Sequence, residues 1–122
     1  MVDEDKRYRS FGKPLRVIDG DTVVMMLDLG FYTYKKIELR LLNVDTHELN
    51  GDNHRKAVKE KKYVQGWFSD YDLEDEEYPF YVYTLEKPDS FGRYLGDIWT
   101  LDRENRLVGE LKDKFDDIEW EG

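Results

Sequence analysis

A run of residues in which apolar and charged side chains alternate constrains the fold of this chain more than any other feature. The run lies within residues 33–42 and reads Lys36, Ile37, Glu38, Leu39, Arg40, Leu41. A period of two puts successive side chains on opposite faces of a β-strand, so this segment is predicted to be a half-buried strand. The side chain of Arg40 is then expected on the face away from Leu39 and Leu41.

Other segments add strands and two helices in a recognisable order. A first strand is expected to lead up to Val17 and Ile18, and residues 22–29, 80–85 and 94–100 have strand-like composition. Two segments instead carry apolar residues at helical spacing: Ala57, Val64, Trp67, Phe68 and Tyr71, and later Leu107, Leu111, Phe115 and Ile118. Three strands, a helix, two strands and a helix predict an α+β fold, a five-stranded antiparallel OB-fold barrel with flanking helices.

Length and charge limit the organisation and the partners of the chain. Its 122 residues fit one domain, residues 1–122, of which the charged first ten are expected to be partly mobile. The formal net charge is −9. A protein that merely coats nucleic acid is expected to be basic, so an acidic chain that handles nucleic acid needs a bound cation or a local basic patch. Residues 55–62, with five basic side chains and Glu60, are one candidate patch, although a solvated helix face explains them equally well.

The absence of cysteine excludes disulfides, thiolate metal sites and cysteine nucleophiles. The first seven residues are mostly charged, and no apolar segment follows them. We therefore expect neither a signal peptide nor a membrane span, and predict a cytoplasmic or virus-encoded intracellular protein.

Three short segments carry residues suited to phosphodiester chemistry: Asp19-Gly20-Asp21-Thr22, residues 40–48, and Phe91-Gly92-Arg93. Carboxylates from separate segments, together with a backbone carbonyl, are ligands that a hard cation such as calcium prefers. Arginines beside such a site can bind phosphate through paired hydrogen bonds. Each segment alone also has an ordinary structural explanation, because Asp-Gly forms turns and Asp, Thr and Glu cap helices.

Taken together and in this order, the three segments resemble the signature of the staphylococcal nuclease (thermonuclease) family. That signature reads Asp-Gly-Asp-Thr, then Arg-Leu-x-x-Val-Asp-Thr-Pro-Glu, then Tyr-Gly-Arg. The second segment is the most specific, since Arg40, Asp45, Thr46 and Glu48 all keep the family spacing. The resemblance extends from about Val17 to about Phe115, and the family's OB barrel has the same order of elements.

The resemblance implies a calcium-dependent nuclease that hydrolyses DNA and RNA with little sequence preference and leaves 3′-phosphates. Asp21, Asp45 and the backbone carbonyl of Thr46 would bind Ca²⁺. Glu48 would hold or deprotonate the attacking water. Arg40 and Arg93 would bind the scissile phosphate and stabilise its growing charge, and Phe91 would pack against a sugar or base of the substrate.

The chain departs from the family pattern at several positions. His47 stands where the family has proline, Phe91 replaces a tyrosine, and Ser90 replaces a lysine. The chain also ends soon after Phe115, before the tyrosines that line the family's nucleotide pocket, so a partner chain or oligomer could complete that pocket. The alternative function is a non-catalytic OB-fold module that binds nucleic acid or calcium.

Overall fold

Five strands and two helices follow one another in the computed structural model, which describes residues 7–118 apart from the side chains of Arg7, Glu86 and Lys87. The elements are β1 (Arg7–Asp19), β2 (Thr22–Asp28), β3 (Tyr34–Leu41), α1 (His54–Asp70), β4 (Phe80–Pro88), β5 (Tyr94–Thr100) and α2 (Leu107–Lys114). Of the ten residues expected to be partly mobile, 1–6 lie outside the described residues. Residues 7–10 begin β1 and pair with β4.

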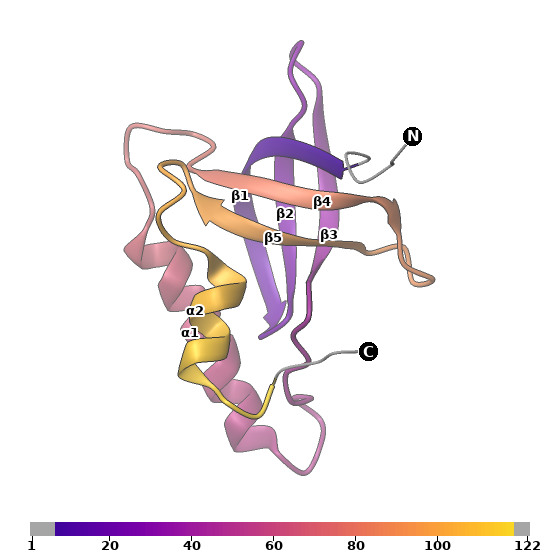
Figure 1. Ribbon diagram of the computed structural model, residues 1–122, viewed down its shortest axis with the longest axis vertical. Coiled ribbons are helices and arrows are strands. Elements are labelled where there is room, and N and C mark those ends of the chain that lie inside the picture. The colour runs from indigo at the N-terminus through magenta and orange to yellow at the C-terminus, as the bar shows by residue number, and fades with distance from the viewer. Residues whose placement is uncertain (1–6, 119–122) are drawn as a thin grey trace.

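The strands close into a barrel in the order β1-β2-β3-β5-β4, with β4 pairing back onto β1 (Figure 1). This arrangement confirms the predicted α+β fold with an OB-fold-like barrel. One ladder differs from a fully antiparallel barrel, because β3 and β5 run parallel where Leu39, Arg40 and Leu41 pair with residues 94–96. That ladder brings the start of β5 beside the end of β3.

The inward faces of the strands form the core of the barrel. Leu39 and Leu41 are buried while Arg40, between them, is half-buried and faces outward, which confirms the orientation predicted from the alternation. Gly96 allows β4 and β5 to approach closely, since a methyl group there would lie 2.0 Å from the carbonyl oxygen of Tyr83. A larger residue at position 96 would push the two strands apart.

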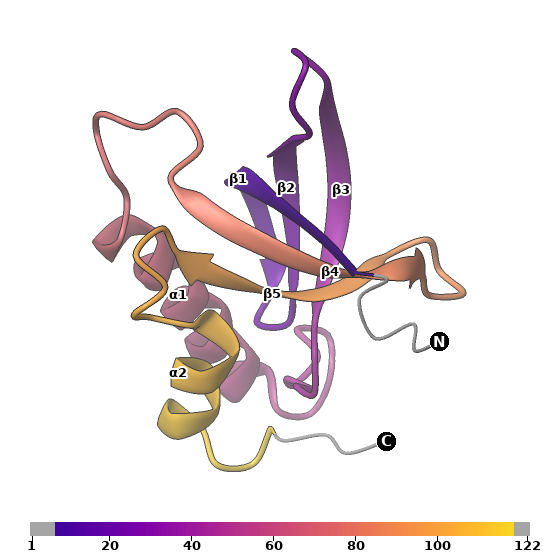
Figure 2. The ribbon, with the colours of Figure 1, turned by 45° about the horizontal axis from the view of Figure 1, so that its top comes forward.

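Both helices lie together at one end of the barrel (Figure 2). Helix α1 packs against β1, and α2 packs against α1 and β5. The buried face of α1 contains Ala57, Val64, Trp67 and Phe68, as predicted, but also Glu60, which is only 1% exposed. Within the part of the chain that the structure describes, no helix is long and apolar enough to cross a membrane.

Helix α2 is capped by a side chain from the barrel and is shorter than its apolar spacing predicts. Asp97 of β5 accepts a hydrogen bond of 3.1 Å from the backbone N–H of Val108, in the first turn of the helix. The helix ends at Lys114, and Phe115 has extended backbone angles. Ile118 is buried as predicted, but it follows a turn at residues 116–117, and its carbonyl accepts the N–H of Asp45 at 2.7 Å. The expectation of helix through residue 118 was therefore wrong, because this backbone bond with the loop after β3 replaces the helical one.

Candidate active site

The Asp-Gly-Asp turn between β1 and β2 presents the carboxylate of Asp21 to the loop that follows β3. The Asp21 carboxylate accepts the hydroxyl of Thr22 at 2.9 Å and the backbone N–H of Thr46 at 3.0 Å. Gly20 allows this approach, because a methyl group there would lie 2.8 Å from Cγ2 of Thr46 and 2.9 Å from Cβ of Glu60. The tight turn thus packs directly against both the loop and α1.

Arg40 joins the two predicted metal-binding carboxylates. Its Nη2 atom lies 3.5 Å from Oδ2 of Asp21 and 3.5 Å from Oδ1 of Asp45. Its Nη1 atom donates to the carbonyls of Leu41 at 2.9 Å and Val44 at 2.5 Å. The guanidinium is therefore fixed at the end of β3 by carbonyls on one side and carboxylates on the other. We call Asp21, Arg40 and Asp45 the ion triad.

The carboxyl groups of Asp19 and Asp21 are hydrogen-bonded to each other, and Asp19 carries the proton. Burial, together with the hydrogen bond and negative charge of Asp21, raises the pKa of Asp19 to about 7. Burial also acts to raise the pKa of Asp21, but the hydrogen bond from Asp19, the charge of Arg40 and the N–H of Thr46 together hold it below its usual value. Asp21 is therefore the ionised member of the pair, as a cation ligand must be.

The loop carrying Asp45 and Thr46 is fixed by contacts that the sequence analysis missed. Buried Glu60 accepts the backbone N–H of His47 at 2.8 Å and the ring Nδ1 of His47 at 2.7 Å. The other ring nitrogen of His47 lies 3.5 Å from Asp117. We call His47, Glu60 and Asp117 the histidine clamp. Glu60 falls three residues after Ala57 and four before Val64, so its position on the buried stripe was a signal available in the sequence.

The histidine clamp is itself a group of potential metal ligands, with one ligand atom from each residue lying within 4.8 Å of the others. His47 already contacts both carboxylates of the group, and Nζ of Lys56 lies 3.1 Å from Asp117. The clamp is therefore explained as a support for the loop.

Glu48 and Arg93, the other two predicted catalytic residues, stand apart from the ion triad. Glu48 is exposed, and among residues 7–118 no hydrogen bond or ion pair joins its carboxylate to Asp21, Arg40 or Asp45. Arg93 is bound by Asp89, with Nε at 3.0 Å and Nη2 at 2.9 Å from the same oxygen. The guanidinium of Arg93 also lies 5.1 Å from the ring centre of Phe91, which is 80% exposed.

The parallel ladder nevertheless brings the backbone of Arg93 near β3. Arg40 pairs with Leu95 in that ladder, and Arg93 lies two residues before Leu95, just ahead of β5. A groove of about 790 Å³ lies beside this ladder. We call it the basic groove, because its charged lining residues are three cations, Arg16, Lys35 and Lys36, and one acid, Glu38.

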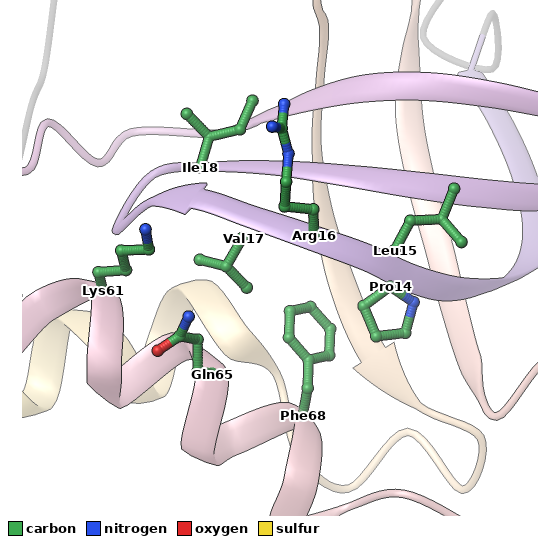
Figure 3. A pocket seen from close by; sticks show the side chains of 8 residues that line it. All are labelled: Pro14, Leu15, Arg16, Val17, Ile18, Lys61, Gln65 and Phe68. Carbon is green, nitrogen blue, oxygen red and sulfur yellow. The ribbon is translucent and has the colours of Figure 1, made fainter.

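A depression of about 560 Å³ between β1 and α1 has a different character. Figure 3 shows the ring of Phe68 of α1 beside Pro14 and below Val17 of β1, with Lys61 and Gln65 at the helix side. None of the predicted site residues is among the residues that line it. The lining combines apolar side chains with Arg16, Lys61 and Gln65 and contains no carboxylate that could bind a cation.

A third groove, of about 650 Å³, contains aromatic residues that the sequence analysis did not single out. Tyr81, Tyr83 and Trp99 line it together with Arg9, Arg103 and Arg106, and we call it the arginine–aromatic groove. The alternation of Tyr81 and Tyr83 with Phe80 and Val82 was the signal for an aromatic outer face. Trp120, another aromatic residue that could stack on a base, lies outside the described residues.

Comparison with known proteins gives similarity without a function. No family model matches the chain. The chain is 27% identical to the uncharacterized protein MJ1439 of Methanocaldococcus jannaschii, in an alignment of 155 residues that covers 99% of this chain and 70% of that protein. The similarity therefore extends over nearly the whole chain, and the name of that relative assigns no activity.

Proposed function

We propose that this chain is a calcium-dependent nuclease that hydrolyses phosphodiester bonds of DNA and RNA with little sequence specificity and leaves 3′-phosphates. The ion triad carries the proposal. It unites a carboxylate from the β1–β2 turn, a carboxylate from the loop after β3, and an arginine fixed between them. An arginine and paired carboxylates at one point are suited to binding both a cation and a phosphate.

The residues at the ion triad fit calcium by their chemistry. Asp21, Asp45 and the carbonyl of Thr46 would hold the ion, and all three offer the oxygen ligands that calcium prefers. The Thr46 hydroxyl is buried and, among the described residues, has no hydrogen-bond partner, so polar capacity remains beside the carboxylates. Bound calcium would supply positive charge to the oxygens of the scissile phosphate.

The chain's own residues supply the remaining roles. Arg40, fixed by the carbonyls of Leu41 and Val44, is oriented to bind a phosphate oxygen. Arg93 is held by Asp89 and would bind a second oxygen, so that negative charge developing on the phosphate is met by two guanidiniums. Glu48, an exposed carboxylate, would hold the attacking water and accept its proton.

The basic groove supports a nucleic-acid substrate despite the net charge of −9. Its three cations come from β1 and β3, and Gly92 and Tyr94, on either side of Arg93, also line it. Cations along one groove can bind a phosphate backbone without reading its sequence. Low sequence specificity follows from that mode of binding.

A second candidate function is a non-catalytic module that binds nucleic acid or calcium. The observation in its favour is that Glu48 and Arg93 stand apart from the ion triad, and that Arg93 is already paired with Asp89. Such a module would keep the metal carboxylates and the basic groove but would lack turnover.

Digestion of single-stranded DNA and RNA oligonucleotides tests the proposal. Purified chain is incubated with calcium, with magnesium or with chelator, and Glu48→Gln and Arg93→Ala are compared with the exposed controls Glu74→Gln and Lys114→Ala. We expect cleavage with calcium only, with rate losses on the order of 10²–10³ in the site variants and little change in the controls. Product ends that block polymerase extension until a phosphatase is added would identify 3′-phosphates.

A wild-type chain that binds calcium in calorimetry but cleaves neither oligonucleotide would contradict the nuclease and favour the binding module. Cleavage that persists in chelator would contradict the calcium dependence.

A further inference from the structure

The outer face of β1, β4 and β5 carries an aromatic row that crosses all three strands. Phe11 pairs with Tyr81, and Tyr81 pairs with Trp99, so the three rings stand side by side on one surface. Phe11 is 50% exposed and lies edge-on to Tyr81, with ring centres 6.1 Å apart. The barrel core faces the other way, so these rings are not needed to fill it.

Guanidinium groups lie over the aromatic rings of this surface. The Cζ atom of Arg103 is 3.9 Å from the ring centre of Tyr81. Arg9 lies 5.7 Å from the ring centre of Tyr83, and Arg106 lies 5.8 Å from that of Trp99. Aromatic rings and stacked guanidinium planes are both surfaces on which nucleic-acid bases stack.

The charge of the arginine–aromatic groove is opposite to that of the whole chain. Three arginines and one acid, Asp97, line it, whereas the chain carries −9. The Asp97 carboxylate is already occupied by Arg106 and by the backbone N–H groups of Ile98 and Val108. The carboxylate of nearby Asp102 accepts hydrogen bonds from the hydroxyl of Thr100 and the backbone N–H of Glu104. The exposed side chains of Arg9 and Arg103 are therefore left to meet an anionic ligand.

The groove also adjoins the segment that leads into the ion triad. Leu42 and Asn43 line one side of it. Asn43 precedes Asp45 by two residues, a span of at most about 7 Å even in a fully extended chain. A polymer bound in the groove would thus pass close to the candidate active site.

We propose that the arginine–aromatic groove binds single-stranded nucleic acid, with bases stacked on its rings and guanidinium planes and phosphates paired with Arg9 and Arg103. That the bound strand is also the strand to be cleaved rests on the proposed nuclease function. The combination of planar surfaces and cations favours a ligand that has both bases and phosphates, because an anion without a planar group would not stack on the rings.

Binding of a fluorescent ten-nucleotide strand, measured by anisotropy in chelator so that no calcium-dependent cleavage occurs, tests the groove. Tyr81→Val removes an outward ring but keeps strand propensity, and Arg103→Gln removes an exposed charge. Lys114→Gln on α2 removes the same charge elsewhere, outside residues 55–62, and is the matched control. Thermal unfolding of each variant checks that the fold is retained.

We expect the dissociation constant to rise about tenfold in Tyr81→Val, as for loss of one stacked base. Arg103→Gln should lower the slope of log affinity against log salt by about 0.7, as for loss of one phosphate contact on a single strand. Lys114→Gln should leave both quantities unchanged, and a strand of abasic sites should bind more weakly than the normal strand. Equal binding of the abasic strand, or equal loss in Lys114→Gln and Arg103→Gln, would contradict binding in the groove.

The two proposals fail in different ways. Suppose that the chain cleaves nucleic acid with calcium, but that Tyr81→Val and Arg103→Gln bind the strand as the wild type does. This result would refute binding in the groove without contradicting the nuclease proposal. Strand binding that depends on the groove, in a chain that never cleaves, would confirm the groove and refute the nuclease.

Discussion

The Nη2 atom of Arg40 lies 3.5 Å from a carboxylate oxygen of Asp21 and 3.5 Å from one of Asp45. The two carboxylates come from segments more than twenty residues apart, and their mutual repulsion is offset by this one guanidinium. A cation is therefore already present where the proposed calcium ion would be attracted. Arg40 and calcium are expected to compete electrostatically, and this competition has a measurable consequence.

Arg40→Gln is expected to strengthen calcium binding while it abolishes cleavage. Removing a positive charge beside two carboxylates leaves their field free to attract calcium, which at a partly screened site corresponds to roughly a tenfold lower dissociation constant. Cleavage is lost because a phosphate partner has gone. Calorimetric titration with calcium measures the first effect and oligonucleotide digestion the second. Arg55→Gln is the control, and weaker calcium binding in Arg40→Gln would contradict the assignment of the metal site.

Gly20→Ala is expected to destabilise the protein by about 1–3 kcal/mol, because a methyl group there overlaps Thr46 and Glu60. The turn must then move away from the loop, so calcium binding should weaken as well. Gly66→Ala on α1 is the matched control. A methyl group at Gly66 meets nothing within 4 Å, and helix propensity should stabilise that variant by about 0.5–1 kcal/mol. Urea unfolding in the presence of chelator measures the change in stability of both variants. Equal effects of the two substitutions would refute the close approach of Gly20 to Thr46 and Glu60.

Asp19→Asn is expected to remove a loss of stability that occurs as the pH rises. The folded protein holds a proton on Asp19 up to about pH 7, whereas the unfolded chain releases it near the ordinary pKa of 3.8. The stability that this proton contributes is complete below about pH 4 and is lost as the pH rises through 7. Asparagine keeps the acceptor for the Asp21 N–H and never ionises.

At pH 8 in chelator, Asp19→Asn should be more stable than the wild type by on the order of 1 kcal/mol, a value reduced by solvent screening at this half-buried position. Near pH 4 the two proteins should be closely matched. Asp21 acts in the opposite sense, since its lowered pKa stabilises the fold above pH 3.8 and that contribution is lost in acid. Urea unfolding from below pH 3.8 up to pH 8 samples both windows, and a difference in stability between the two proteins that stays constant with pH would contradict the proton held on Asp19.

Glu60→Gln is expected to loosen the histidine clamp and destabilise the fold by about 1–3 kcal/mol, because a buried hydrogen-bond partner of His47 is weakened. The N–H of His47 should exchange with solvent faster, since Glu60 accepts that N–H in the folded protein. Hydrogen exchange followed by NMR reads this bond directly. Glu74→Gln, in the exposed segment after α1, is the control, and unchanged exchange at His47 would show that the clamp does not hold the loop.

Local sequence pattern was sufficient to predict the elements and the facing of their side chains. The alternation around Leu39 and Leu41 predicted that Arg40 faces outward, and the structure places it there. Apolar spacing predicted most of the buried face of α1. These features depend on the local geometry of the backbone. A strand or helix therefore shows in the sequence as an apolar period of two or 3.6 residues.

The end of α2 and the role of Glu60 required the tertiary structure. Apolar spacing continued the second helix to Ile118, but the helix ends at Lys114 and the N–H of Asp45 donates to the carbonyl of Ile118. Glu60 was grouped with the basic residues around it because a charged side chain is rarely buried. The spacing put Glu60 on the buried stripe, but the hydrogen-bond partner that lets its carboxylate stay buried, His47, comes from thirteen residues earlier in the chain.

The composition of the candidate site was readable from sequence, whereas its assembly was decided by closure of the barrel. Pairing of Thr22 with Arg40 brings the Asp21 turn beside the end of β3, and the ion triad forms there. The roles of Glu48 and Arg93 stay predictions, because a motif specifies residue types and spacing but not the side-chain contacts that each residue makes. Sequence by itself determined which side chains were present and which face each occupied. Only the long-range pairing of strands and loops decided which of them meet, since that depends on contacts between residues far apart in the chain.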